Sequence, residues 1–383
     1  MSDKKKRILV CIDWYEPGFK AGGPIRSVVN MVNALKQNYE IYILTSAYDL
    51  GETDPYPNVE LNQWHDQNGV LVKYMNKKAL TTASVRGNIL EIDPDILYLN
   101  SLFSRLFTIA PLFISHRRRI KVVLAPRGML GAGALDIKRG KKRLFLFIAK
   151  FFRFYRKVIW HASTIEEEKE IKKVFGKRAK VFIAQNIPIT QTKSLDEILN
   201  KKETGICRFI FLSRIATKKN LHLAIEAVKQ LKNTMPVEFD IYGNIEDQEY
   251  YDSFKSEIRE HPNVSIRYKG LLNPASVSDV LIHADYMVLP TKHENYGHSI
   301  VEAWANGCPV IISKNTPWKN LRNKDLGWDV DIEDPKHLVN AMQEGIDMDF
   351  TSYLTMVRAS YQYFSEKICD ESVLQANKQL FEQ

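Results

Sequence analysis

Two glutamates with seven residues between them, Glu294 and Glu302, are the side chains of this sequence that most directly indicate chemistry. They follow the apolar run Tyr286–Leu289 and precede Gly307, so the order predicts a strand, a loop that carries Glu294, and a helix that carries Glu302 about two turns inside. Loops at the carboxyl ends of parallel strands bind ligands in open α/β sheets, and the first turn of the next helix offers unpaired N–H groups. The pattern predicts two carboxylates that accept hydrogen bonds from sugar hydroxyl groups.

Two cations stand at the end of a second predicted strand. The run Phe209–Ser213 is apolar and of the buried type; Arg214 follows it, and Lys219 comes five positions later, before a helix that begins at about Asn220. The arginine fork takes two phosphate oxygens, and the lysine contributes a compact charge. The pair is therefore suited to a diphosphate, which it can neutralise without a metal ion.

A glycine-bearing loop follows the first predicted strand, Arg7–Ile12. Gly22 and Gly23 precede Arg26 and a helix predicted from Ser27 to about Lys36. Because glycine lacks a side chain, the backbone of such a loop can approach an anion closely at the start of a helix.

Together, the motifs Gly22-Gly23-x-x-Arg26, Arg214-x4-Lys219 and Glu294-x7-Glu302 resemble those of the retaining glycosyltransferases of the GT-B fold, family GT4. The resemblance covers nearly the whole chain, since the motifs stand in the family's order and in the expected halves. It implies two Rossmann-like, doubly wound parallel-sheet domains of α/β class that face a central cleft.

The resemblance also implies roles for single residues. Arg214 and Lys219 would hold the nucleotide diphosphate, Glu294 would contact the transferred sugar, and Glu302 would bind the ribose hydroxyls. The remaining donor-binding residues would be Gly22, Gly23, Asn295, Tyr296, Gly297, His298 and Ser299.

Three further residues are expected on the acceptor side. Similar proteins often carry histidine where this chain has Arg127. The position faces the reaction centre in those proteins, so Arg127 would contact a phosphate or the acceptor. An arginine there does not support the role that the histidine has in those proteins. His161 matches a strand end of the family, although a lone histidine is more often structural. Arg26 of the glycine motif is the third.

Short apolar runs alternate with helical stretches over all 383 residues, which predicts two doubly wound parallel sheets. We expect an N-terminal acceptor domain over residues 1–190, a nucleotide-sugar domain over 191–363, and a final helix, 364–383, that packs back on the first domain. The stretch 186–205 lacks a clear period and is the best linker. The predicted strands after the first are 41–44, 96–99, 121–124, 158–160, 181–184, 209–212, 239–242, 265–268, 286–289 and 309–312.

The positive charge of the chain is concentrated in one region. Residues 115–180 hold twenty Lys or Arg and five Asp or Glu, although the whole chain carries only +9. Within this region, 137–157 mixes basic and aromatic residues, which is typical of a helix that lies on an anionic membrane surface. A helix that packs on the core with a solvated basic face explains the segment equally well. Nucleic acid is disfavoured, because no recognised binding module accompanies the charge.

Other features exclude some classes of protein. The four cysteines have no paired or metal-ligand spacing, and Asp93-Pro94-Asp95 is better explained as a turn before a strand than as a metal site. We expect no metal and no cofactor. The chain shows no signal-peptide core and no apolar run of membrane-spanning length. It is expected to be cytoplasmic, and peripheral on the inner face of the cell membrane if 137–157 binds there.

These features predict a retaining glycosyltransferase that moves a sugar from a nucleotide diphosphate sugar to a lipid-linked glycan in cell-surface polysaccharide synthesis. A GT-B sugar-nucleotide epimerase would share the diphosphate site but act without an acceptor. A non-catalytic, membrane-recruited subunit that binds nucleotide sugars or glycans is the alternative outside enzymes.

Overall fold

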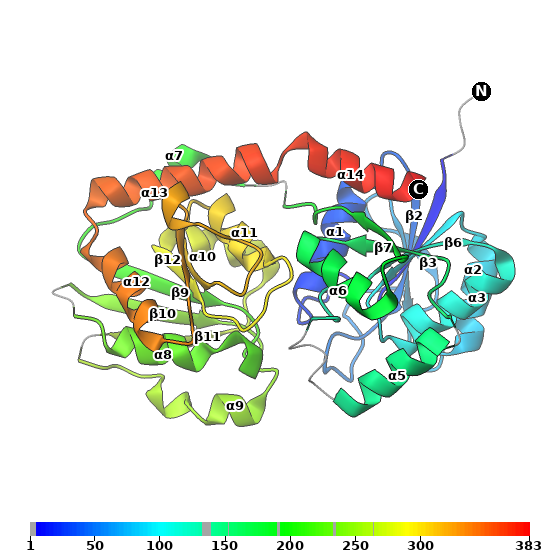
Figure 1. Ribbon diagram of the computed structural model, residues 1–383, viewed down its shortest axis with the longest axis horizontal. Coiled ribbons are helices and arrows are strands. Elements are labelled where there is room, and N and C mark those ends of the chain that lie inside the picture. Colours follow the sequence, from blue (N-terminus) through cyan, green and yellow to red (C-terminus); the bar gives the residue numbers. More distant parts are fainter. Residues whose placement is uncertain (1–4, 132–138, 152, 190–191, 233–234, 263) are drawn as a thin grey trace. The chain divides into compact units, whose positions relative to one another are not determined.

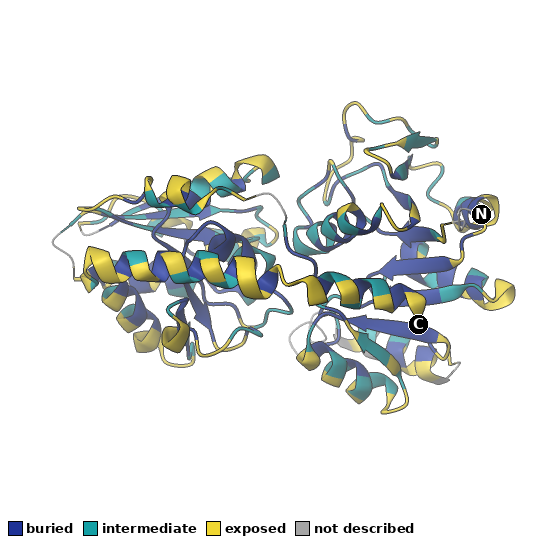
Figure 2. Ribbon diagram, turned by 90° about the horizontal axis from the view of Figure 1, so that it is seen from above, coloured by how far each residue is buried: buried dark blue, intermediate teal, exposed yellow. Residues whose placement is uncertain are grey.

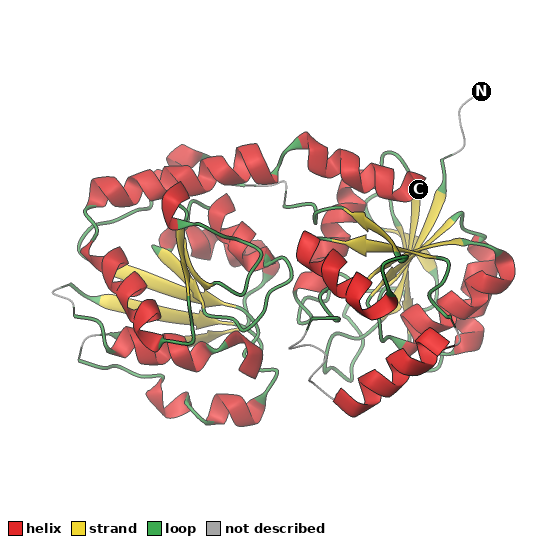
Figure 3. Ribbon diagram, in the orientation of Figure 1, coloured by secondary structure: helices red, strands yellow, loops and turns green. Residues whose placement is uncertain are grey.

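The computed structural model describes residues 5–131, 139–151, 153–189, 192–232, 235–262 and 264–383. The chain forms two compact units, Met1–Ile187 with Glu371–Gln383, and Pro188–Asp370. In each unit helices cover a parallel sheet (Figures 1 and 3). Residues 364–370, which we expected in the helix that returns to the first domain, belong to the second unit. Within the predicted basic segment 137–157, residues 137, 138 and 152 lie outside the described residues.

The sheet of the first unit has eight strands in the order β3-β4-β2-β1-β5-β6-β7-β8. All neighbours are parallel except β3, which is antiparallel to β4. The edge strand β3 and its neighbour β4 were not predicted, because they are short and only partly buried instead of forming a continuous apolar run. The strands are β1 (Arg7–Cys11), β2 (Glu40–Ser46), β3 (Trp64–Asp66), β4 (Leu71–Met75), β5 (Ile96–Asn100), β6 (Lys121–Ala125), β7 (Val158–Ala162) and β8 (Lys180–Ile183).

Helix α1 (Gly23–Leu35) begins four residues before the predicted start, because Pro24 fits the first turn of a helix. The last helix, α14 (Glu371–Glu382), belongs to this unit: Phe381 is fully buried against Tyr39 and Tyr98. The other helices are α2 (Thr82–Ile92), a π-helical turn (Arg105–Ile109) that continues into α3 (Ala110–Arg118), α5 (Arg139–Phe151) and α6 (Ile165–Phe175).

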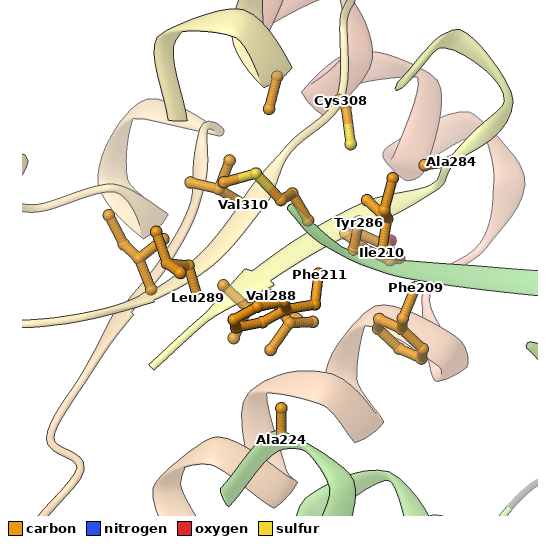
Figure 4. Packing of buried hydrophobic residues seen from close by; sticks show 14 of the residues in the cluster. Phe209, Ile210, Phe211, Ala224, Ala284, Tyr286, Val288, Leu289, Cys308 and Val310 are labelled. Atoms are coloured by element: carbon orange, nitrogen blue, oxygen red, sulfur yellow. The ribbon is translucent and has the colours of Figure 1, made fainter. Parts of the chain in front are cut away.

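The sheet of the second unit is all parallel in the order β11-β10-β9-β12-β13-β14. Buried aromatic and aliphatic side chains of its central strands form the core, with Phe209 stacked on Tyr286 (Figure 4). Strand β14 was not predicted, because its four residues include a glycine and an aspartate. The strands are β9 (Cys207–Leu212), β10 (Val237–Tyr242), β11 (Ser265–Gly270), β12 (Tyr286–Leu289), β13 (Val310–Ser313) and β14 (Gly327–Val330).

The expected linker 186–205 contains a helix of the second unit, α7 (Leu195–Leu199). Ser194 and Glu197 form a reciprocal capping box at its start, and Ile198 is fully buried. The Ser-x-x-Glu spacing was the available signal in the sequence. The other helices are α8 (Leu221–Lys229), α9 (Gln248–Asp252), α10 (Val277–His283), α11 (His298–Ala305), α12 (Pro335–Asp347), α13 (Phe350–Tyr363), four 3-10 turns (217–219, 255–257, 274–276 and 322–324) and a π-helical turn (364–368).

Burial follows this architecture in both units: the central strands are buried, β3 and β8 are partly exposed, and the helices expose their outer faces (Figure 2). No helix in the described ranges combines the length and the apolar character needed to cross a bilayer.

Gly327 allows β13 and β14 to pair closely, so we expect a larger side chain at this position to destabilise the second unit. Its φ is +122°, and a Cβ there would lie 1.8 Å from the backbone oxygen of Val310. We expect Gly327→Ala to lower the free energy of unfolding of the second unit by about 2 to 5 kcal/mol, because strain and overpacking add. Gly270→Ala is the matched control: its φ is +78°, but nothing lies within 4 Å of the added carbon. The control should lose only about 1 kcal/mol. Equal shifts of both variants in urea denaturation would contradict the explanation by close approach.

Candidate functional site

The second sheet has one point at which its strand order reverses, between β9 and β12. From β9 the chain proceeds outward through β10 and β11, and from β12 it proceeds the other way through β13 and β14. The loops that leave β9 and β12 therefore meet at the carboxyl edge of neighbouring strands, which is where open α/β sheets bind ligands. Both predicted motifs of this half lie in these two loops.

The loop after β9 carries the predicted cations. Arg214 forms an ion pair with Glu246 from the loop after β10. A 3-10 turn, Thr217–Lys219, then ends in a left-handed Asn220, whose side-chain amide donates to the oxygen of Pro290 at 3.0 Å. Lys219 is 7% exposed, so its ammonium group is held at the start of α8 and is not a solvated surface charge.

Lys219 forms an ion pair with Glu294 of the loop after β12. The side chains are only 9% and 19% exposed. Burial opposes ionisation of Glu294, but Lys219, and then Lys218 and Arg214, outweigh it and lower the pKa of this carboxyl group. The carboxylate is therefore charged at neutral pH.

Lys218 belongs to the same cluster and was not singled out in the sequence. Burial, together with the charges of Arg214 and Lys219, lowers its pKa to about 8, against the opposing effect of Glu246 and Glu294. A Lys-Lys pair just before the helix was the available signal. Three cations thus converge on one strand end, two of them already paired with carboxylates.

Backbone hydrogen bonds fix the two loops to each other. The N–H of Lys292 donates to the oxygen of Lys218 at 2.8 Å, and the hydroxyl group of Thr291 donates to the same oxygen at 3.2 Å. The N–H of Glu294 donates to the oxygen of Asn315, beyond β13, at 3.1 Å. The position of the Glu294 carboxylate is therefore set by three strand ends.

Gly297 closes this loop and is the N-cap of α11, with a φ of +81°. A Cβ at this position would lie 2.7 Å from Ile300 and 3.2 Å from the side chain of Glu294. Glycine is therefore required by both the backbone and the close approach. Helix α11 begins at His298, so Glu302 lies in its second turn, nearer the helix start than expected, and is 7% exposed.

Aromatic packing supports the same loop. Tyr296 is 3% exposed, packs edge-on against Trp318 and His298, and accepts a hydrogen bond from the Trp318 indole at its backbone oxygen (2.6 Å). Asn295, His298 and Ser299 flank it at the helix start. The loop predicted to bind the donor is thus one packed element with Glu294.

The first sheet also reverses its order, between β1 and β5. Gly22, with a φ of +69°, is the N-cap of α1, and nothing would lie within 4 Å of a Cβ there. Gly23 and Arg26 lie in the first turn, and the charge of Arg26 opposes the effect of burial, which raises the pKa of Glu16. Asp13, after β1, accepts a hydrogen bond from Ser104 at 2.7 Å. Asp13 was missed in the sequence because a single polar residue after a strand is a weak signal.

Arg127 lies at the same edge of the first sheet and donates to Asn100, Asn186 and Tyr98. His161 is 2% exposed; one ring nitrogen lies 2.8 Å from the Tyr98 hydroxyl group and the other 2.8 Å from the oxygen of Ala184. Burial, and secondarily the charge of Arg127, lowers the pKa of His161 to about 3. The ring is neutral and is buried beneath Tyr98, so it contributes by orienting Tyr98 and Arg127.

The carboxyl edges of the two sheets therefore differ in the ligands that they suit. Residues of the second unit form a cationic, partly buried cluster next to a fixed carboxylate and an open helix start, which suits an anion joined to a polyhydroxyl group. In the described ranges, no three His, Cys, Asp or Glu side chains gather as metal ligands would.

Comparison with known proteins agrees with this arrangement. Residues 192–362 match the family model "Glycosyl transferases group 1". Over 152 residues the chain is 29% identical to the poly(glycerol-phosphate) alpha-glucosyltransferase of Bacillus subtilis; the match covers 39% of this chain and only 21% of that enzyme.

Two solved structures show the fold. Anabaena Alr3699/HepE, solved in complex with UDP and glucose, superposes with a TM-score of 0.72 at 15% identity and 98% coverage of both chains. The sucrose-phosphate synthase of Thermosynechococcus elongatus superposes with a TM-score of 0.73 at 14% identity and 99% coverage of both chains. The two-sheet GT-B fold that the motifs predicted is confirmed, and residues 192–362, which lie in the second unit, are similar to the glycosyl transferases group 1.

Proposed function

We propose that this chain is a retaining glycosyltransferase that moves a sugar from a nucleotide diphosphate sugar to a glycan acceptor. The observation that carries the proposal is the cluster at the β9–β12 reversal, where Arg214, Lys218 and Lys219 surround the Glu294 carboxylate. This is the charge arrangement that a diphosphate bonded to a sugar requires. The relative named as an alpha-glucosyltransferase and the neighbour solved in complex with UDP and glucose support it.

In this proposal the three cations stabilise the diphosphate as it leaves. Negative charge develops on the phosphate oxygens as the bond to the sugar breaks, and ammonium and guanidinium groups already in place reduce the barrier without reorganisation. One such donor contributes about 3 to 4 kcal/mol. A departing phosphate oxygen takes the acceptor proton on the same face of the sugar, so no protein nucleophile is needed.

Glu294 would orient the sugar during the same step. Its ion pair with Lys219 places a charged carboxylate beside the leaving group, and its backbone is attached to the loop beyond β13. Glu302, in the second turn of α11, would bind the ribose hydroxyls.

We further propose that the acceptor is a lipid-linked glycan of cell-surface polysaccharide synthesis and that the first unit associates with an anionic membrane. On α5, Leu146 and Ala149 are buried, whereas Leu144, Phe147 and Ile148 are 61%, 68% and 39% exposed. The spacing of the three exposed side chains places them on one helical face. The helix thus packs on the core and also exposes an apolar ridge.

Basic residues surround this ridge. Phe113 of α3 is 47% exposed and packs edge-on against Phe154, which follows α5. A cavity of about 260 Å³ nearby is lined by His116, Arg119, Lys121 and Lys157, among others. Further exposed cations are Arg117, Arg118, Lys150, Arg153 and Arg156. Exposed apolar side chains on the same elements as exposed cations favour an anionic lipid surface over neutral lipid.

The alternatives remain separable by measurement. An epimerase would convert the nucleotide sugar without acceptor, and a non-catalytic subunit would bind it without turnover. Neither alternative needs the Glu294 carboxylate next to the leaving group.

The donor site can be tested by calorimetric binding of uridine, guanosine and adenosine diphosphate sugars with metal chelated. We expect one donor to bind, and Lys219→Ala to weaken it about 10- to 150-fold, because a charge-assisted hydrogen bond contributes about 1.5 to 3 kcal/mol. Lys229→Ala, at the other end of α8, also removes a paired lysine and should bind as the parent does. Absence of binding by every donor to the folded protein would refute the proposed site.

The pKa of Lys218 predicts how donor affinity depends on pH. With a pKa of about 8, Lys218 is protonated at pH 7 and largely neutral at pH 9, while a diphosphate remains fully ionised over this range. Affinity should therefore fall severalfold from pH 7 to pH 9. In Lys218→Arg the charge persists, because the guanidinium group does not titrate, and the affinity should stay nearly constant. An equal decline in both proteins would show that Lys218 does not act on the ligand.

Membrane association is tested by sedimentation with vesicles of phosphatidylcholine containing phosphatidylglycerol. We expect Phe147→Ser to lower vesicle affinity about tenfold, because burying a phenylalanine contributes about 1.5 to 3 kcal/mol. Leu90→Ser removes a side chain of α2 that is 39% exposed and should have no effect. Equal binding to vesicles of phosphatidylcholine alone would contradict the role of the cations.

A further inference from the structure

Arg127 is a cation held entirely by neutral groups. Its Nε donates to the side-chain oxygen of Asn100 at 2.7 Å, one terminal nitrogen donates to Asn186, and the other donates to the Tyr98 hydroxyl group at 2.8 Å. Within the described part of the chain, no carboxylate lies within 4.0 Å of its guanidinium nitrogens. The positive charge is oriented by its partners without being neutralised.

The partners form a rigid cradle. Tyr98, Asn100, His161 and Asn186 are between 0% and 4% exposed. The oxygen of Ala184 can only accept, so the neutral His161 ring donates to it and its other nitrogen accepts the Tyr98 proton. The Tyr98 oxygen then accepts from Arg127. The guanidinium plane is thus fixed by a hydrogen-bond chain that begins in the core.

The backbone at Arg127 is strained. Its φ is +54°, and that of Gly128 is +71°. A left-handed conformation costs a residue other than glycine about 1 to 3 kcal/mol and persists where the surroundings enforce it, often at ligand sites. Here it directs the side chain toward Asn100 and Asn186 at the carboxyl edge of the sheet.

The nearest candidate counter-ion is committed elsewhere. Glu167 is 1% exposed; one of its oxygens accepts from the N–H of Gly128 at 2.7 Å, and the other accepts from the N–H and hydroxyl groups of Ser163. A guanidinium group carries five N–H donors, and Arg127 uses three on the described residues. Two donors, one on each terminal nitrogen, remain available on a side chain of intermediate exposure.

The Arg127 side chain lies at the edge of the sheet where ligand sites occur in this class of fold. Asn100 ends β5, next to the reversal between β1 and β5, and its amide lies 3.5 Å from the oxygen of Pro24 in the first turn of α1. Arg127 lies just after β6, separated from the strand only by Pro126. Ligands of open α/β sheets bind at this edge.

We propose that Arg127 recognises a carboxylate or phosphate group on the saccharide that the first unit binds. This inference rests on the proposed function, which makes the ligand a saccharide. It adds that this saccharide is anionic. Two donors on a planar, preoriented fork match the two oxygens of such a group, and lysine could not reproduce this geometry. The anion belongs either to the acceptor or to a uronic acid carried by the donor.

The test observes the arginine side chain in the full-length protein. With 15N-labelled arginine, the Nε–Hε resonance of Arg127 is assigned as the one lost in Arg127→Lys, and glucuronate, glucose 6-phosphate and glucose are titrated. We expect glucuronate or glucose 6-phosphate to shift this resonance saturably, and glucose to leave it unchanged. Asn100→Asp is the matched variant: it places a carboxylate next to the Nε of Arg127 and should weaken binding of the anion at least tenfold.

The outcomes separate this inference from the proposed function. If nucleotide sugar binds in a Lys219-dependent manner while the Arg127 resonance responds to neither anion, or responds equally to chloride, the inference is overturned and the donor site stands. The source of the anion follows from calorimetry of UDP-glucuronate and UDP-glucose. A preference for UDP-glucuronate that disappears in Arg127→Lys assigns the anion to the donor; equal affinities, with a responding resonance, assign it to the acceptor.

Discussion

The ion pair between Lys219 and Glu294 is the interaction on which the second unit's site depends. It joins the loops after β9 and β12 at the point where the strand order reverses, and both side chains are largely withdrawn from water. A buried charge that loses its partner is costly, so each member holds the other in position. The pair is therefore preorganised: its ammonium group and carboxylate are in direct contact and largely withdrawn from water before any ligand arrives. Lys218 and Arg214 then make the surroundings net positive.

The first unit orients its charged side chain, Arg127, by different means. Its carboxyl edge fixes Arg127 through amide and hydroxyl oxygens, with a neutral histidine beneath them. A carboxylate would have held the guanidinium group more strongly but would have cancelled its charge. Neutral partners cost less desolvation than a second ion and leave the field of the cation intact. The second unit therefore combines an ion pair with an excess of cations, whereas the first unit holds a cation that, among the described residues, is hydrogen-bonded by neutral groups.

Sequence patterns predicted the continuous, buried parts of this architecture. The runs at β1, β5, β9 and β12 are apolar on both faces, so their positions and the residues that follow them could be read directly. The strands β3, β4 and β14 and the helix α7 were not predicted, because short or half-buried elements derive their stability from tertiary contacts rather than from their own periodicity. The side chains that orient Arg127, namely Tyr98, Asn100 and Asn186, were missed for another reason: they lie 27 to 59 residues from Arg127 in the chain. The register of β5 beside β6 brings Tyr98 and Asn100 to Arg127, and the loop after β8 brings Asn186.

The same register explains how residue 127, where the resemblance predicts a histidine, can hold an arginine. An imidazole at residue 127 would be too short to reach Asn100, Asn186 and Tyr98 together, whereas the long guanidinium side chain spans all three. Tyr98 is in turn held by His161 from β7, so Arg127 is supported by side chains from β5, β7 and the loop after β8. An arginine introduced only for its charge would not need this support. The cradle therefore indicates that the direction of the guanidinium donors, as well as their charge, contributes to ligand recognition in this chain.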